Sequence, residues 1–284
     1  MATDYNQISS DLYEKYRAAN NVGISYTGLI YNLDVGYGTT NLYDPVKNRF
    51  IELSPNYQNK NFTFSTPGSG LLATNGIGTV SIAFTGGGTD YETNDITATI
   101  PGIGTDTPSK LTVEMWAKIN NFSGHYNGNP NSNAGGMLFS FDCYDVWTGD
   151  NDINGTLGFN AFDATTVGLT TTTVQSLGLE GNWKHYVFVM TPYVSNAGIT
   201  TENKIYINSS DQGTLVNTRG VGYGNTNTRG FAGGRFKING NSCGGFSSQY
   251  KLDMDVGEVR IYNREITSSE VTQNFNATKG RYGY

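Results

Sequence analysis

The last part of the chain constrains the fold more than any other stretch. Within Met254–Val271, Val259 and Ile261 alternate with polar or amphipathic neighbours, which is the period of a half-buried strand. Thr267 and Glu270 then stand at the spacing of a capping box, in which the hydroxyl accepts from a free helix N–H and the carboxylate reaches back. The stretch therefore predicts one strand, a tight corner and a short closing helix.

Composition extends this prediction to the whole chain. Of the 284 residues, 37 are Gly, 15% are charged and 13% are aromatic. Turn formers between short apolar runs favour strands over helices, and the length fits one large domain or a domain with an appendage. The formal net charge is −6, and no run of Lys or Arg occurs. Nucleic acid and anionic membranes attract cationic surfaces, so we expect neither as a partner.

Short apolar runs with the period of strands recur along the chain. Alternation in the longest predicted strand puts Leu111, Val113 and Met115 on one face, with Glu114 and Trp116 on the other. The predicted strands are Leu29–Gly36, Val80–Phe84, Leu111–Ile119, Met137–Cys143, Gly155–Phe162, Trp183–Met190, Lys204–Asn208 and Phe236–Gly240.

The order and content of these strands resemble those of the laminin-G-like, concanavalin A-like jelly-roll family. The L-T-V-E-M-W-A-K of 111–118 resembles the family's F-T-(I/V)-E-x-W-(V/A)-K strand, and the W-K-H-Y-V-F-V of 183–189 resembles another. The ending G-E-V-R-I-Y-N-R of 257–264 resembles the family's last strand. The resemblance implies an all-β, two-sheet antiparallel jelly-roll sandwich that ends in a short helix. Members of the family include both binding modules and glycosidases.

The chain is expected to have two parts: an N-terminal segment, 1–27, and a jelly-roll domain, 28–284. Asp11 and Glu14 can cap the start of a short helix in the first part. Such a helix is marginal alone and needs a partner surface, either its own domain or another protein. On such a helix, three apolar or aromatic side chains would form an exposed stripe, which we predict to anchor the chain: Leu12, Tyr13 and Tyr16.

Three carboxylates near the chain end raise the question of catalysis. Retaining β-glucanases of the same jelly roll carry E-x-D-x-x-E on a bulged strand, and Asp253, Asp255 and Glu258 resemble this motif, with Gly257 permitting a bulge. Here the first carboxylate belongs to the shorter Asp. A retaining pair stands about 5–5.5 Å apart and tolerates little displacement. We therefore predict no enzymatic activity, with a retaining glycosidase as the alternative.

Aromatic and acidic residues gather in one loop after the predicted strand Met137–Cys143. A ring face covers the apolar face of a sugar while carboxylates accept from its hydroxyls, so the loop is the candidate ligand site; a solvated loop with a packed Trp is the alternative. Laminin-G-like relatives often bind calcium at such a rim, but no fixed ligand spacing is present, and we predict no cofactor or metal site. The candidate ligand-binding residues are Tyr144, Asp145, Trp147, Asp150 and Asp152.

Histidine and cysteine supply no further site. His185 lies in an apolar strand and is expected to be a structural residue, and with His125 as the second His no catalytic triad can be proposed. Cys143 and Cys243 stand far apart, and we expect free buried thiols.

The expected function is a virion surface protein: a fibre, an adhesin or a head or tail decoration. Residues 275–284 resemble sequences of tailed-phage proteins, and the first residues have no cationic or apolar leader pattern. We expect synthesis in the host cytoplasm and display on the virion surface. Expected partners are other virion proteins, further copies of the chain with a trimer favoured, and a host-surface glycan. The alternatives are a glycoside hydrolase or depolymerase and a free-standing carbohydrate-binding module.

Overall fold

The computed structural model describes sixteen segments of the chain. They are residues 23–25, 27–34, 39–44, 49–52, 82–84, 96–99, 110–126, 129–134, 136–141, 144–148, 157–161, 167–169, 173–190, 200–218, 235–238 and 251–284.

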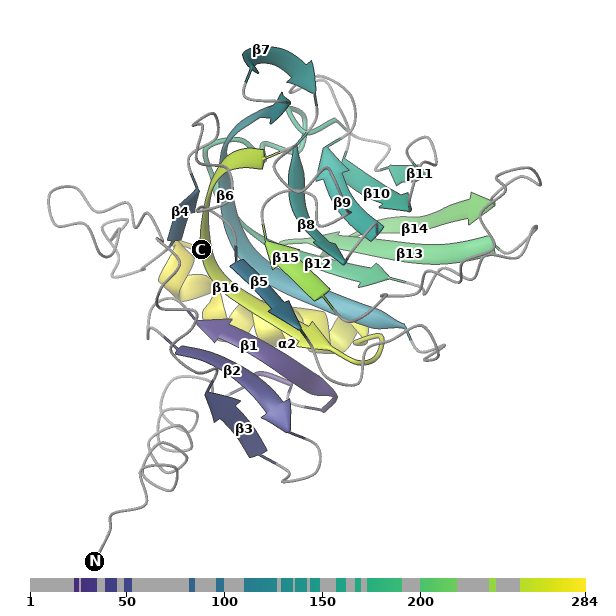
Figure 1. Ribbon diagram of the computed structural model, residues 1–284. Helices are drawn as coiled ribbons and strands as arrows, with labels where there is room; N and C mark the ends of the chain where they lie inside the picture. The colour runs from purple at the N-terminus through teal and green to yellow at the C-terminus, as the bar shows by residue number, and fades with distance from the viewer. Residues whose placement is uncertain are drawn as a thin grey trace, which may run out of the picture.

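The strands form two antiparallel sheets (Figure 1). The described strands of the first sheet lie in the order β14 (Ser210–Thr218), β13 (Thr200–Ile207), β12 (Trp183–Met190), β6 (Leu111–Tyr126), β16 (Lys251–Tyr262), β1 (Leu29–Asp34), β2 (Thr39–Asp44) and β3 (Arg49–Glu52), with β4 (Ile82–Phe84) beside β16 and β7 (Asn129–Ala134) beside β6. Those of the second lie in the order β11 (Val167–Leu169), β10 (Leu157–Ala161), β9 (Tyr144–Thr148), β8 (Met137–Phe141), β15 (Arg235–Ile238) and β5 (Ile96–Thr99). The predicted two-sheet antiparallel sandwich is confirmed.

An aromatic core fills the space between the two sheets. Phe188 of β12 meets Phe139 of β8 and Phe159 of β10 edge to face, at ring-centroid distances of 5.3 and 6.1 Å. All three rings are buried, and such edge-to-face contacts add to the hydrophobic burial that holds the sheets together. This core follows from the alternation of the strands, because every second residue of β6, β12 and β16 faces the second sheet.

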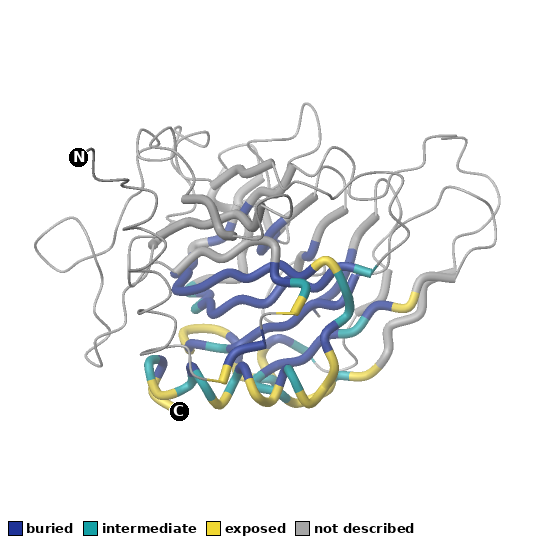
Figure 2. Tube along the Cα trace, turned by 90° about the horizontal axis from the view of Figure 1, so that it is seen from below, coloured by how far each residue is buried: buried dark blue, intermediate teal, exposed yellow. Residues whose placement is uncertain are grey.

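A short helix covers the other face of the first sheet. Helix α2 (Ser268–Thr278) continues into the 3₁₀ turn η5 (Lys279–Tyr282). In Figure 1, α2 crosses behind β1, β16 and β6 while the second sheet lies in front. In Figure 2 the same helix runs lengthwise below the strands, with exposed residues on its outer side and buried strands next to its inner side. The sandwich therefore has a third layer, made by the end of the chain.

The predicted capping box starts this helix. The Thr267 hydroxyl accepts from the Glu270 backbone N–H at 3.2 Å, and the Glu270 carboxylate accepts from the Thr267 N–H at 2.8 Å. Arg264 also donates to Glu270 at 2.9 Å. The hydrogen bonds from Arg264 lower the pKa of Glu270, outweighing the opposite effect of partial burial. The first turn of α2 is thereby fixed to the corner that precedes it.

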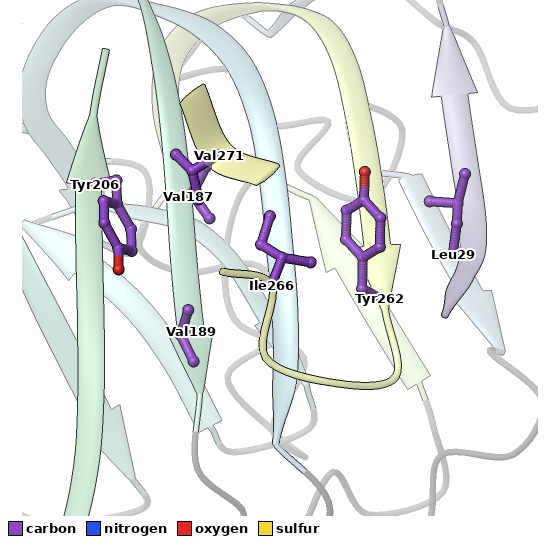
Figure 3. Close-up of a cluster of buried hydrophobic side chains, with 7 residues drawn as sticks. All are labelled: Leu29, Val187, Val189, Tyr206, Tyr262, Ile266 and Val271. Atoms are coloured by element: carbon purple, nitrogen blue, oxygen red, sulfur yellow. The ribbon is translucent and has the colours of Figure 1, made fainter. Parts of the chain in front are cut away.

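Apolar residues beneath α2 form a second hydrophobic cluster on the outer face of the first sheet (Figure 3). It joins the corner and the helix to strands β1, β12, β13 and β16. Its members are Leu29, Val187, Val189, Tyr206, Tyr262, Ile266 and Val271.

The connector ahead of β1, of which the structure describes residues 23–25, 27 and 28, packs on α2. Ile24 and Ser25 are buried, and the Ser25 backbone N–H donates to the Asn274 Oδ1 at 2.8 Å. The predicted helix with Leu12, Tyr13 and Tyr16 lies outside the described residues, so its existence and its anchoring role stay predictions. Among the described helices, none has the length and apolar character needed to cross a membrane.

Candidate functional site

The candidate ligand residues that the structure describes belong to β9, an inner strand of the second sheet. Tyr144, Asp145 and Trp147 pair in register with Ala161, Asn160 and Gly158 of β10. Asp150 and Asp152 lie outside the described residues, as do Cys143 and Cys243. The prediction of a loop was therefore wrong for three of the five residues, which the structure places in strand β9.

Strand pleating assigns two of these positions to the same face. Val146 is buried and pairs with the buried Phe159, so this position faces the core between the sheets. Successive residues of a strand alternate between faces, which assigns positions 145 and 147 to the outer face of the second sheet. This face is the one turned away from α2 (Figure 1).

The three carboxylates of the glucanase-like motif lie in β16, which has the expected bulge. The register between β16 and β6 shifts between Val256 and Glu258, so the bulge falls at Gly257. Asp255 lies opposite Lys118, and their side chains form an ion pair at 2.7 Å. For Asp253 the structure gives the backbone register alone, opposite Asn121.

Glu258 is engaged on the helix-covered face of the sheet. Its carboxylate accepts from Arg260 of the same strand and from Arg281 of η5, and it has no exposed side-chain surface. A general acid or nucleophile must contact its substrate. The arrangement instead ties the last turn of the chain to β16.

Glu114 of β6 is the centre of a buried polar cluster, which we call the Glu114 cluster: Glu114, His185, Arg260, Tyr262 and Asn274. The carboxylate contacts His185 Nε2 at 2.8 Å and accepts from Arg260 at 3.2 Å. It also accepts from the Tyr262 hydroxyl at 3.0 Å and from the Asn274 amide at 2.7 Å. The five members come from β6, β12, β16 and α2, so the cluster joins the helix to the middle of the sheet.

Electrostatics keep this buried carboxylate ionised. Burial alone raises the pKa of Glu114, but the charge of Arg260 and the hydrogen bonds from His185 and Asn274 lower it to about 2. Burial raises the pKa of Tyr262 well above its ordinary value, and the neighbouring Glu114 charge adds to the effect. Tyr262 therefore stays a hydrogen-bond donor to a charged acceptor, which is a strong arrangement inside a protein.

An aromatic stack closes the same face beside the Glu114 cluster. The Trp116 ring lies 4.2 Å from that of Tyr282, nearly parallel at 11°, and 5.8 Å from that of Phe275. Its indole N–H donates to Thr278 of α2 at 2.8 Å. The Tyr282 ring sits over Gly257, where an added Cβ would come within 2.3 Å of the hydroxyl oxygen. The bulge glycine is thus required by the packing of η5.

Sequence reasoning found only part of this arrangement. The structural role predicted for His185 is confirmed, since its side chain is buried and bonded to Glu114. Alternation also put Glu114 and Trp116 on one face, but their partners Asn274 and Thr278 were missed. A charged residue inside an otherwise apolar strand was the signal available for Glu114, because buried carboxylates need partners.

A protein-family model with the same type of fold matches the sequence. Residues 91–272, more than half of the chain, match the model of the concanavalin A-like lectin/glucanases superfamily. The protein belongs to this superfamily, whose description covers lectins as well as glucanases. No curated protein matches the sequence.

Solved structures with a similar fold come from several organisms. Domain 4 of AbnA, an extracellular arabinanase from Geobacillus stearothermophilus solved with arabinotriose, is 18% identical with a TM-score of 0.48, over 88% of this chain and 99% of that one. The binding domain of botulinum neurotoxin DC, solved with SialylT, is 11% identical with a TM-score of 0.48, over 88% of this chain and 51% of that one. A sialidase from Trypanosoma rangeli is 13% identical with a TM-score of 0.45, over 95% and 38%.

Proposed function

We propose that the protein is a non-catalytic, glycan-binding virion surface protein of the concanavalin A-like superfamily. One observation carries the choice of binding over hydrolysis. Asp255 and Glu258, two of the three carboxylates that a retaining mechanism would use, are ion-paired on the face covered by α2 and η5. Membership of a superfamily of lectins and glucanases supports a carbohydrate ligand.

The ligand site of this proposal is the outer face of the second sheet around β9. Binding is tested on a glycan array with the purified chain, followed by calorimetry on the best glycan. Trp147→Ala should weaken binding about five- to 150-fold, the range that corresponds to the ~1–3 kcal/mol contributed by a ring in base–aromatic stacking. Asp145→Asn should weaken it through loss of a charged acceptor. Asp211→Asn, at an exposed position of β14, is the matched control. Unchanged binding in both β9 variants would refute this placement of the site.

Catalysis is tested separately. Purified protein should release no reducing sugar from β-glucans or from the glycans found on the array. Release by the wild type that disappears in Glu258→Gln would replace the proposal with the glycosidase alternative. A glycan that binds but is not cleaved supports it.

The virion setting is supported by the resemblance of residues 275–284 to sequences of tailed-phage proteins. In this setting residues 1–27 attach the domain to other virion proteins, with a trimer as the favoured state. Mass spectrometry of purified particles should find the chain in fixed ratio to the capsid or tail proteins. Its absence from particles would leave a free carbohydrate-binding module as the better proposal.

A further inference from the structure

The connector ahead of β1 is held by side chains that do not belong to β1 or to its neighbours in the sheet, β16 and β2. The Ser25 N–H donates to Asn274, and the Ser25 hydroxyl donates to Glu270 at 2.6 Å. Arg264 donates to the Thr27 carbonyl at 2.9 Å and to the Ser25 hydroxyl at 3.3 Å. We call these contacts of Ser25 and Thr27 the clasp.

The clasp lies at the point where a pull on the N-terminus would reach the sandwich. Strand β1 begins at Leu29, opposite Tyr262, and runs antiparallel to β16. A force applied upstream of Leu29 would load the β1–β16 ladder at one end. Ladder hydrogen bonds lie perpendicular to the strands, so such a load opens them one after another. Without the clasp, β1 would peel from the sheet.

Asn274 carries the load to a different part of the sheet. Its Oδ1 accepts from Ser25, while its Nδ2 donates to Glu114 at 2.7 Å and to the Tyr262 hydroxyl at 3.0 Å. Glu114 belongs to β6, which lies between β12 and β16. Ser25 is therefore connected through one side chain to the centre of the sheet.

Burial protects the hydrogen bond between Ser25 and Asn274 from competition by water. Ser25 is 9% exposed, Asn274 is fully buried, and the apolar side chain of Ile24 is 6% exposed. Gly23 lies against Ala277 of α2, its built Cβ position 3.5 Å from the alanine Cβ. The connector thus packs along α2 before it turns into β1.

We propose that the clasp is a mechanical strap, which protects β1 from peeling when load enters through the N-terminal segment. The inference rests on the proposed function in one respect: attachment through residues 1–27 would supply the load. The strap itself is a property of the isolated chain, so it can be tested whether or not the protein is found in virions.

The experiment pulls single molecules of the full chain at constant force. One handle is attached at the N-terminus and the other at Ser210→Cys, an exposed position at the start of β14, with Cys143→Ser and Cys243→Ser to leave one reactive thiol. Ser25→Ala should shorten the lifetime of the folded state about tenfold, the effect of removing roughly one hydrogen bond to a charged group. Ser176→Ala, which removes an exposed hydroxyl bonded to Thr173, is the matched control and should leave the lifetime unchanged.

A second pulling direction separates a strap from general stability. With handles at Gln175→Cys and Ser210→Cys, both exposed, the load does not pass through the connector. Ser25→Ala should leave the lifetime in this direction unchanged. An equal loss in both directions would show that Ser25 contributes to overall stability alone and would overturn the proposal. So would equal lifetimes of Ser25→Ala and Ser176→Ala under N-terminal load.

Discussion

The two faces of the first sheet are built on different physical principles. The face toward the second sheet is an apolar core, where Phe188 meets Phe139 and Phe159 through ring contacts. The face toward α2 carries ionised side chains, Glu114 and Arg260 among them, without exposure to solvent beyond a few percent. Hydrophobic burial is non-directional, whereas a buried carboxylate is stable only with its donors in place. The first face fixes how tightly the sheets pack, and the second fixes where the chain end must dock.

Glu114→Ala should show the largest effect and sharpen this contrast. The change removes one of the buried carboxylates paired with Arg260, which keeps Glu258, and takes the buried acceptor from the Tyr262 hydroxyl and the Asn274 amide. It should lower the free energy of unfolding by about 3–5 kcal/mol. Met115→Ala, one residue along and on the apolar face, should cost about 2–5 kcal/mol through its cavity. Urea denaturation measures both. Glu180→Ala, at an exposed position, should stay within about 0.5 kcal/mol of the wild type.

The proposed difference between the two faces would be contradicted if Glu114→Ala changed the free energy of unfolding as little as Glu180→Ala. That result would mean that the Glu114 cluster contributes nothing net. Helix α2 would then be held by its other contacts, such as the stack of Phe275 on Trp116 and the hydrogen bond from Trp116 to Thr278.

The sequence could predict the first face better than the second. Strand period is local, so alternation alone separated Met115 from Glu114, and the spacing of Thr267 and Glu270 predicted the helix start. The partners of Glu114 lie up to 160 positions away in the sequence, Asn274 among them. A local sequence pattern does not extend over such a separation, so it could not predict them.

The candidate sites show the same limit. The spacing of Asp255 and Glu258 resembles that of a glucanase motif, but the spacing did not predict their ion pairs with Lys118 and Arg281. At β9 the sequence predicted a group of residues, and the structure adds the strand and the register. Ligand binding there stays a prediction.

Acid should weaken the polar face selectively. The pKa of Glu114 is about 2 in the folded protein against an ordinary value of 4.5. Because the folded value is the lower one, the stabilisation is fully present above about pH 4.5 and is lost as the pH falls through 2. The loss amounts to about 3 kcal/mol for a shift of this size. Unfolding free energies between pH 7 and pH 2 should therefore fall more steeply for the wild type than for Glu114→Gln.

Glu265 and Glu270 also have lowered pKa values, through Lys110 and Lys204 in one case and Arg264 in the other, against the opposing effect of burial. Both carboxylates are present in the wild type and in Glu114→Gln, so their contributions cancel when the two pH profiles are compared. Parallel pH profiles for the wild type and Glu114→Gln would contradict the assignment to Glu114.

Gly257→Ala should disturb the polar face through packing rather than charge. A Cβ at this position would overlap the Tyr282 ring, and overpacking of this kind costs about 1–3 kcal/mol. Gly280→Ala is the matched control, because nothing lies within 4 Å of its built Cβ. In a Tyr282→Ala background the Gly257→Ala cost should fall below about 0.5 kcal/mol, since contacting residues are coupled in a double-mutant cycle. Full additivity of the two changes would show that the ring does not set the requirement for glycine.

The smallest effect compares two buried tyrosines, one on each face. The Tyr262 hydroxyl donates to Glu114 and accepts from Asn274, so Tyr262→Phe should cost about 1–2 kcal/mol. The Tyr186 hydroxyl is buried and has no hydrogen-bond partner among the described residues, and burial strongly raises the pKa of Tyr186. Removing this hydroxyl breaks no hydrogen bond to the described residues and takes away a polar group that is buried at a cost. Tyr186→Phe should therefore be neutral or stabilising by about 1 kcal/mol. The same chemical change should therefore lower the free energy of unfolding on one face and leave it unchanged or raise it on the other, as measured by urea denaturation at pH 7. A loss of stability in Tyr186→Phe would mean that the aromatic core also contains a satisfied polar contact, and the difference between the two faces would then be one of degree.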